Sequence, residues 1–138
     1  MHEWAVAESI VLTVLKEAEK NGMRFLDRIV LRIGELQRME KDILCFAMES
    51  IFRHYGYELS EKNFDILEEP AFFKCHVCET EWPYVEVLRS MGEEEKEFIH
   101  FIPEVAHGFI KCPSCGSSDF ELERGRGVVI ESISGRIC

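Results

Sequence analysis

The sequence predicts an α+β fold, in which two helices pack on a three-stranded sheet that carries an inserted zinc-ribbon-like module. Two observations support this fold class: apolar residues recur at helical spacing in two segments, and two Cys-x-x-Cys pairs lie in the second half of the chain. The 138 residues, 46% of them hydrophobic, suffice for one small domain with an embedded module.

Both predicted helices have one apolar face and are followed by a glycine. The face of the first helix, residues 4–21, consists of Trp4, Ala7, Val11, Val14, Leu15 and Ala18. The face of the second helix, residues 40–55, consists of Leu44, Ala47, Met48, Ile51 and Tyr55. Gly22 and Gly56 follow as C-terminal caps, and acidic residues in the first turn of the second helix suit its positive end.

Alternating or β-branched segments predict strands at residues 28–36, 63–67, 72–74, 120–122 and 127–133. Two strands alone are marginally stable, so we expect the last segment to return as the third strand of the helical domain. If the last strand joins this sheet, the chain divides into a domain of residues 1–70 plus 125–138 and an inserted module of residues 71–124. Gly125 to Gly127 would then form a flexible joint.

The two Cys-x-x-Cys pairs are separated by 33 residues and consist of Cys75, Cys78, Cys112 and Cys115. Each pair lets one tight turn present two thiolates to the same ion, and two such turns complete a tetrahedron. Four soft thiolates suit Zn²⁺ in a structural role, although iron in a rubredoxin-like site would use the same ligands. A thioredoxin-like redox pair is disfavoured because the predicted elements lack the βαβ frame that it needs.

The composition argues against several function classes. A formal net charge of -10 disfavours nucleic acid as a partner, because phosphate binds to clustered cations. The start of the chain lacks a secretory signal pattern, and no apolar stretch approaches the roughly 20 residues of a membrane span, so we expect a cytoplasmic protein with no membrane partner. We expect no catalysis, because the sequence shows no nucleophile and base pairing and no glycine-rich phosphate loop.

The N-terminus offers a second metal site. The amine of Met1, the amide nitrogen of His2 and the imidazole of His2 can close two fused chelate rings in one plane. A fourth nitrogen from the Glu3 amide or from a second imidazole would complete a square-planar set that suits Ni(II) or Cu(II). By itself, however, a histidine near a chain end is most often a surface residue.

Four features together resemble the HypA family of hydrogenase nickel-incorporation proteins, over nearly the whole chain. They are Met1-His2-Glu3 at the start of a helix, a strand that ends in Ile33-Gly34-Glu35-Leu36, the paired Cys-x-x-Cys motifs, and the final strand that begins at Gly127. The most specific part is the combination of Met-His-Glu with two cysteine pairs in so short a chain.

The resemblance implies a nickel metallochaperone that works with the GTPase HypB and delivers nickel to the hydrogenase large subunit. It assigns nickel binding to the N-terminal motif, with His2 and Glu3 carried over, and zinc binding to the four cysteines. The long segment between the pairs, with His-Phe-Ile-Pro-Glu from His100 to Glu104, resembles the archaeal form. His100 is our first choice as a further nickel ligand, and His107, the Glu3 backbone and water remain alternatives.

A different class of function remains to be weighed, namely a zinc-ribbon interaction or regulatory protein without a nickel role. In that case Met1-His2-Glu3 would be incidental. The sequence leaves open the nickel affinity, a weak self-association and whether urease maturation is also served.

Overall fold

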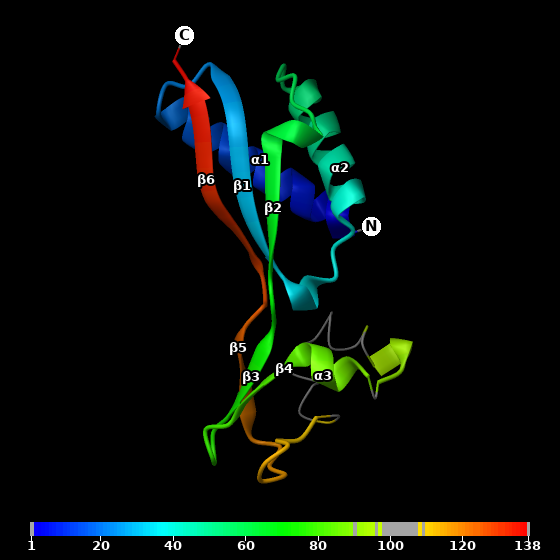
Figure 1. Cartoon of the computed structure of the whole chain (residues 1–138). Coiled ribbons are helices and arrows are strands. Elements are labelled where there is room, and N and C mark those ends of the chain that lie inside the picture. The colour runs from blue at the N-terminus through cyan, green and yellow to red at the C-terminus, as the bar shows by residue number, and fades with distance from the viewer. Residues whose placement is uncertain (1, 90, 96, 98–107, 109, 138) are drawn as a thin grey trace. The chain divides into compact units, whose positions relative to one another are not determined.

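The described residues form two three-stranded sheets (Figure 1), each with its own buried core. A computed structural model describes residues 2–89, 91–95, 97, 108 and 110–137. The first compact unit comprises Met1–Arg32, Met39–Leu67 and Val129–Cys138. The second unit comprises Ile33–Arg38 and Glu68–Val128. None of the helices among the described residues has the length and apolar character needed to cross a membrane.

The first unit has the predicted architecture of two helices on a three-stranded sheet. Its elements are α1 (His2–Lys20), β1 (Phe25–Gly34), α2 (Lys41–His54), β2 (Phe64–Glu69) and β6 (Val128–Arg136). The sheet order is β2-β1-β6, which confirms that the C-terminal strand returns to complete this sheet. Both helices lie against one face of the sheet (Figure 1). Ile29 and Leu31 of the central strand are fully buried beneath them.

Most residues of the predicted helix faces are buried, but Leu15 and Ile51 are only half-buried, and Trp4 and Tyr55 at the ends of the faces are exposed. Trp4 remains 40% exposed and makes an edge-to-face contact with Phe46 of α2, at 6.1 Å between ring centroids. Tyr55 lies beyond the end of α2, where its N–H bonds to the carbonyl of Phe52. Phe52 is buried instead, because it lies one turn after Met48 on the stripe that faces the core. Cys45 of α2 is half-buried.

Charged side chains of the first unit pair between neighbouring strands. Arg28 of β1 bonds to Asp65 of β2, and Arg32 of β1 lies 2.5 Å from Glu131 of β6. Such exposed pairs contribute little individually, but they give the sheet a polar surface in addition to its buried face. This one-sided burial explains why residues 28–33 alternate so clearly in the sequence.

The second unit is built around a small antiparallel sheet with the order β4-β3-β5. Its elements are β3 (Phe72–Cys75), β4 (Glu81–Pro83), α3 (Tyr84–Leu88) and β5 (Phe120–Arg124). Phe73 lies at the centre of its core, with ring contacts to Trp82, Tyr84 and Phe120 at 5.3 to 6.1 Å between centroids. The sequence did not predict β4 or α3, because segments this short carry no measurable periodicity.

Backbone segments approach unusually closely where Gly34, Ala71 and Gly125 meet. A Cβ on Gly34 would lie 2.2 Å from the carbonyl carbon of Gly125, and a Cβ on Gly125 would lie 2.2 Å from the Cα of Ala71. Gly125 also has a φ of +96°, a conformation that favours glycine. The segment predicted as a flexible joint therefore contains a glycine that close packing requires.

Hydrogen bonds connect the same backbone segments. The Leu36 N–H donates to the Gly125 carbonyl at 3.0 Å, and the Gly34 N–H donates to the Gly127 carbonyl at 2.8 Å. The carboxylate of Glu35 accepts from the Ala71 N–H at 2.9 Å. The Ile-Gly-Glu-Leu motif thus has a structural role, since it supplies both the space and the hydrogen bonds of this crossing.

We predict that Gly34→Ala destabilises the second unit by at least about 2 kcal/mol, because the atoms that its Cβ would meet belong to backbone and cannot rotate away. Gly92→Ala is the matched control, since a Cβ there meets nothing within 4 Å. Urea unfolding followed by the fluorescence of buried Trp82 measures the difference. Equal stability of the two variants would contradict the packing argument.

Candidate metal sites

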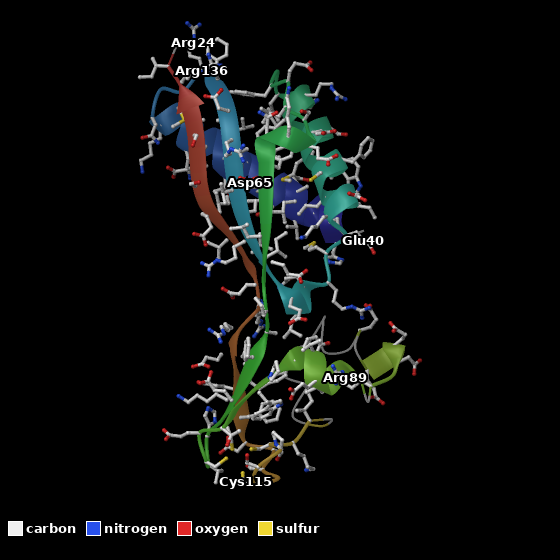
Figure 2. The ribbon with its side chains drawn as sticks, viewed as in Figure 1. Arg24, Glu40, Asp65, Arg89, Cys115 and Arg136 are labelled. Carbon is white, nitrogen blue, oxygen red and sulfur yellow. The ribbon has the colours of Figure 1, made fainter. Side chains whose placement is uncertain are left out.

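The four paired cysteines converge at one end of the second sheet. Cys75 ends β3 and lies opposite Phe120, the first residue of β5, so the antiparallel pairing brings the turn after β3 to the loop before β5. Cys115 lies in that loop (Figure 2). The four Sγ atoms all lie within 4.8 Å of one another. Cys75 and Cys112 are buried, whereas Cys78 and Cys115 are exposed.

The sulfur spacing fits a tetrahedral zinc ion. Cys75 Sγ and Cys115 Sγ are 3.6 Å apart, and Cys78 Sγ and Cys112 Sγ are 3.5 Å apart. A tetrahedron with Zn–S bonds of about 2.3 Å has sulfur–sulfur edges of about 3.8 Å, whereas a disulfide would require about 2 Å. The arrangement therefore suits a four-thiolate zinc site with all coordination positions filled.

The two turns that carry the cysteines have the same hydrogen-bond pattern. The Val77 N–H donates to Cys75 Sγ at 3.3 Å, and the Ser114 N–H donates to Cys112 Sγ at 3.4 Å. Each turn closes with a residue at positive φ, Glu79 at 64° and Gly116 at 74°. Because backbone N–H groups point at the sulfurs, they stabilise negative charge on the thiolates.

Crowding of the four sulfurs also indicates a cation. The Thr80 hydroxyl and backbone lower the pKa of Cys78 to about 6. At Cys115 the backbone of Ser117 favours the thiolate, but partial desolvation and the neighbouring cysteine sulfurs raise the pKa to about 12. Without a metal, the cluster therefore resists losing its last protons. A divalent cation removes this resistance, since it neutralises part of the charge of four thiolates.

His76 lies between the two cysteines of the first turn, but its ring contacts carboxylates. Nδ1 lies 2.9 Å from Asp119 Oδ1, and Nε2 lies 3.3 Å from Glu121 Oε2. These bonds, Asp119 first and Glu121 second, raise the pKa of the imidazole. His76 therefore links the first cysteine turn to the start of β5.

The N-terminal candidate residues begin α1. His2 is its first residue, and its side chain is 35% exposed. Glu3 follows with only 4% of its surface exposed, and its carboxylate accepts a hydrogen bond from the Glu40 N–H at 3.0 Å. Glu40 is the N-cap residue of α2 and lies at the start of that helix (Figure 2). The Glu3 side chain thus connects the beginnings of the two helices.

The environment of Glu3 favours its ionised form. Burial alone would raise the pKa of the carboxyl, but backbone hydrogen bonds from Glu40 and from Glu3 itself, together with the His2 ring, lower it to about 2. The carboxylate also lies at the positive end of α2, for which Glu40 supplies no side-chain cap. The sequence reasoning missed this role, because the pairing depends on how the helices pack.

The remaining nickel candidates, Met1, His100 and His107, lie outside the described residues, as does Cys138. The structure therefore brings together the four predicted zinc ligands and places His2 next to Glu3. Which atoms complete a nickel site stays a prediction.

The fold and the cysteine cluster define the class, a small α+β metal protein with a structural four-cysteine zinc site. The family described as "Hydrogenase/urease nickel incorporation, metallochaperone, hypA" matches residues 1–135. The chain therefore belongs to the HypA family of nickel metallochaperones, which act in hydrogenase maturation. This confirms the family resemblance and the prediction of a role without catalysis.

Curated relatives of this family match over nearly the whole chain. A Hydrogenase maturation factor HypA from Pyrococcus furiosus is 48% identical over 96% of this chain and 94% of its own length. The protein of the same name from Thermococcus kodakarensis is 47% identical over the same shares. Both organisms are archaea, in agreement with the predicted archaeal form.

Solved structures share the fold. The solution structure of the Ni metallochaperone HypA from Helicobacter pylori aligns with a TM-score of 0.56, covering 97% of each chain at 21% identity. A second solution structure of a HypA protein aligns with the same TM-score over 99% of this chain and 98% of its own. At this identity the likeness supports the fold alone.

For the zinc site, we predict that Cys75→Ser and Cys112→Ser lose the roughly one zinc ion per chain and open the core around Trp82, because small metal modules fold largely through their metal. Elemental analysis and Trp82 fluorescence report the two effects. Cys45→Ser, which removes a thiol from α2, should retain zinc. A metal-free protein whose second unit resists proteolysis would exclude this structural role.

For Glu3, we predict that Glu3→Gln lowers the stability of the first unit at pH 7 by about 1–3 kcal/mol, since it removes a charged acceptor at a helix N-terminus. The depressed pKa means that this stabilisation is present above the ordinary pKa of 4.5 and is lost as pH falls toward about 2. Trp4 fluorescence in a Trp82→Phe background measures unfolding of this unit. Glu40→Gln, at an exposed side chain, is the control. The assignment would be contradicted if wild type remained as much more stable than Glu3→Gln at a pH of about 2 as it is at pH 7.

Proposed function

We propose that this chain binds Ni(II) at its N-terminus and delivers it to the large subunit of [NiFe]-hydrogenase together with the GTPase HypB. The observation that carries the proposal is that His2, half-exposed, begins a helix whose start is tied to α2 by the buried Glu3 carboxylate. Its relatives are named hydrogenase maturation factors, and the Helicobacter pylori protein is titled a Ni metallochaperone.

The position of His2 at the helix start suits chelation by backbone nitrogen. The first four N–H groups of an α-helix have no intrahelical acceptor. Nickel can therefore replace the amide proton of His2 without breaking a hydrogen bond of α1. The Met1 amine and the His2 imidazole supply the flanking nitrogens, and the three atoms form the planar set that Ni(II) prefers.

The fourth ligand has four candidates, the Glu3 amide, His100, His107 and water. The Glu3 carboxylate is not among them, because it is buried and bonded to the Glu40 N–H. We propose His100 first, on the strength of its resemblance to the archaeal segment. In this assignment residues 1–70 plus 125–138 form the nickel-binding domain, and residues 71–124 form the zinc module.

The contrast between the two sites supports transport rather than storage of nickel. Four thiolates fill the coordination sphere of zinc and retain it, whereas a nitrogen chelate at a chain end leaves coordination positions through which a receiving protein can take the metal. Trp4 and Phe46 expose 40% and 62% of their surfaces beside this end of α1, and partner proteins commonly bury such aromatic pairs. We propose the cytoplasm as the location, since the five cysteines among the described residues form no disulfide.

His2→Ala should weaken Ni(II) binding by more than about tenfold while zinc content and far-UV circular dichroism stay unchanged, because the two sites share no ligand. Acetylation of the Met1 amine should have a similar effect. The affinity for Ni(II) should also decrease as the pH is lowered, since imidazole and amide nitrogens lose protons when they bind metal. Isothermal titration with NiCl₂ measures all three effects.

His54→Ala is the matched control, because His54 is an exposed histidine at the end of α2. Unchanged nickel affinity in both the His2→Ala and the acetylated protein would exclude the N-terminal site. Such a result would favour a zinc-ribbon interaction protein that has no nickel role of its own.

A further inference from the structure

The two edge strands of the first sheet differ in how well they are protected against pairing with a further strand. In the order β2-β1-β6, both β2 and β6 are edge strands. β2 is 6 residues long and carries three acidic side chains, which discourage pairing with a further strand. β6 is 9 residues long, and apart from Glu131 and its final Arg136 it consists of aliphatic residues, serines and a glycine. No described strand pairs with the outer edge of β6.

A groove of about 480 Å³ runs between this unprotected strand and α1. One wall consists of Thr13 and Glu17 on the exposed side of α1 and of Asn21, which directly follows the last residue of that helix. Met23 and Ile130 to Ile133 form the other wall, with Met23, Ile130 and Ile133 half-buried. The groove thus combines a strand edge, apolar side chains and a polar helix face within one unit.

The chemistry of the groove selects an extended peptide. A strand edge presents backbone donors and acceptors at a spacing that only another extended backbone can match. Pockets beside the edge bind every second side chain of the added peptide and so provide specificity. Thr13 to Asn21 span about 12 Å of helix at about 1.5 Å per residue. This length corresponds to about four residues of a β-strand at roughly 3.3 Å each.

The charges of the groove favour a basic residue in that peptide. Glu131 is paired with Arg32, but Glu17 has no ion-pair partner among the described residues. All other residues that line the groove are uncharged. A lysine or arginine of an occupant could therefore reach Glu17 without displacing a cation of this chain.

We propose that the groove between α1 and β6 binds an extended segment of a partner protein, which pairs with β6 as a fourth strand and places a basic side chain against Glu17. Aliphatic side chains of the segment pack on Met23 and Ile130. The proposal rests on the sheet edge and not on the nickel site, so it stands or fails independently of the proposed function.

The test uses the full-length, zinc-loaded protein and a capped peptide as long as β6, in which valine alternates with lysine and threonine. At about 1 mM peptide, amide exchange at Ile130 to Ile133 should slow by about tenfold or more, because outward-facing N–H groups acquire acceptors. The same peptide with alternate backbone nitrogens methylated, so that its pairing edge lacks N–H groups, should not bind. Peptide affinity is read from fluorescence anisotropy of a labelled copy.

Glu17→Lys should weaken peptide binding by about fivefold or more. Glu19→Lys is the matched control, because it makes the same change of charge on an exposed residue of the same helix outside the groove. Equal losses in both variants would mean general charge attraction and overturn the proposal. Unslowed exchange at β6, or full binding of the methylated peptide, would also overturn it.

A second copy of this chain is the alternative occupant of the groove, and the experiment must distinguish it from a partner segment. In that case the β6 amides would be protected without peptide, and protection would increase with protein concentration. That result would indicate self-association through β6 and would likewise overturn the proposal.

Discussion

Four thiolate sulfurs within 4.8 Å of one another repel each other unless a cation lies among them, and the second unit is arranged around this constraint. The pairing of β3 with β5 brings the two cysteine turns together, and backbone N–H groups at Val77 and Ser114 support the charge on the sulfurs. The aromatic core around Phe73 begins directly beside them. A unit this small has few other sources of stability, so the metal and the core depend on each other.

The first unit is stabilised differently, by conventional packing of amphipathic helices on a sheet. Its one buried charge, among the described residues, is the carboxylate of Glu3. Burial of a charge is costly, and here the cost is offset by the N–H of Glu40 and the positive end of α2. Glu3 therefore holds the first turn of α1 against the start of α2, while the side chain of the neighbouring His2 remains accessible to solvent.

Much of this could be predicted from the sequence. Periodicity located both helices and the long strands, because a one-sided core imposes its spacing on every residue that faces it. The cysteine spacing predicted the zinc site, since ligand geometry requires two turns that each present two sulfurs. Elements such as β4 and α3 were missed, because three to five residues are too few to show a period.

The sequence by itself determined the family, the fold class and the identity of the candidate ligands, because these depend on residue type and on spacing along the chain. Only the tertiary structure decided that Glu3 bonds to Glu40, that Gly34 meets Gly125, and that β6 has an open edge beside α1. Each of these contacts joins segments far apart in the sequence, and no local pattern encodes which distant backbone a side chain or a glycine will meet. Packing of the complete core selects those partners.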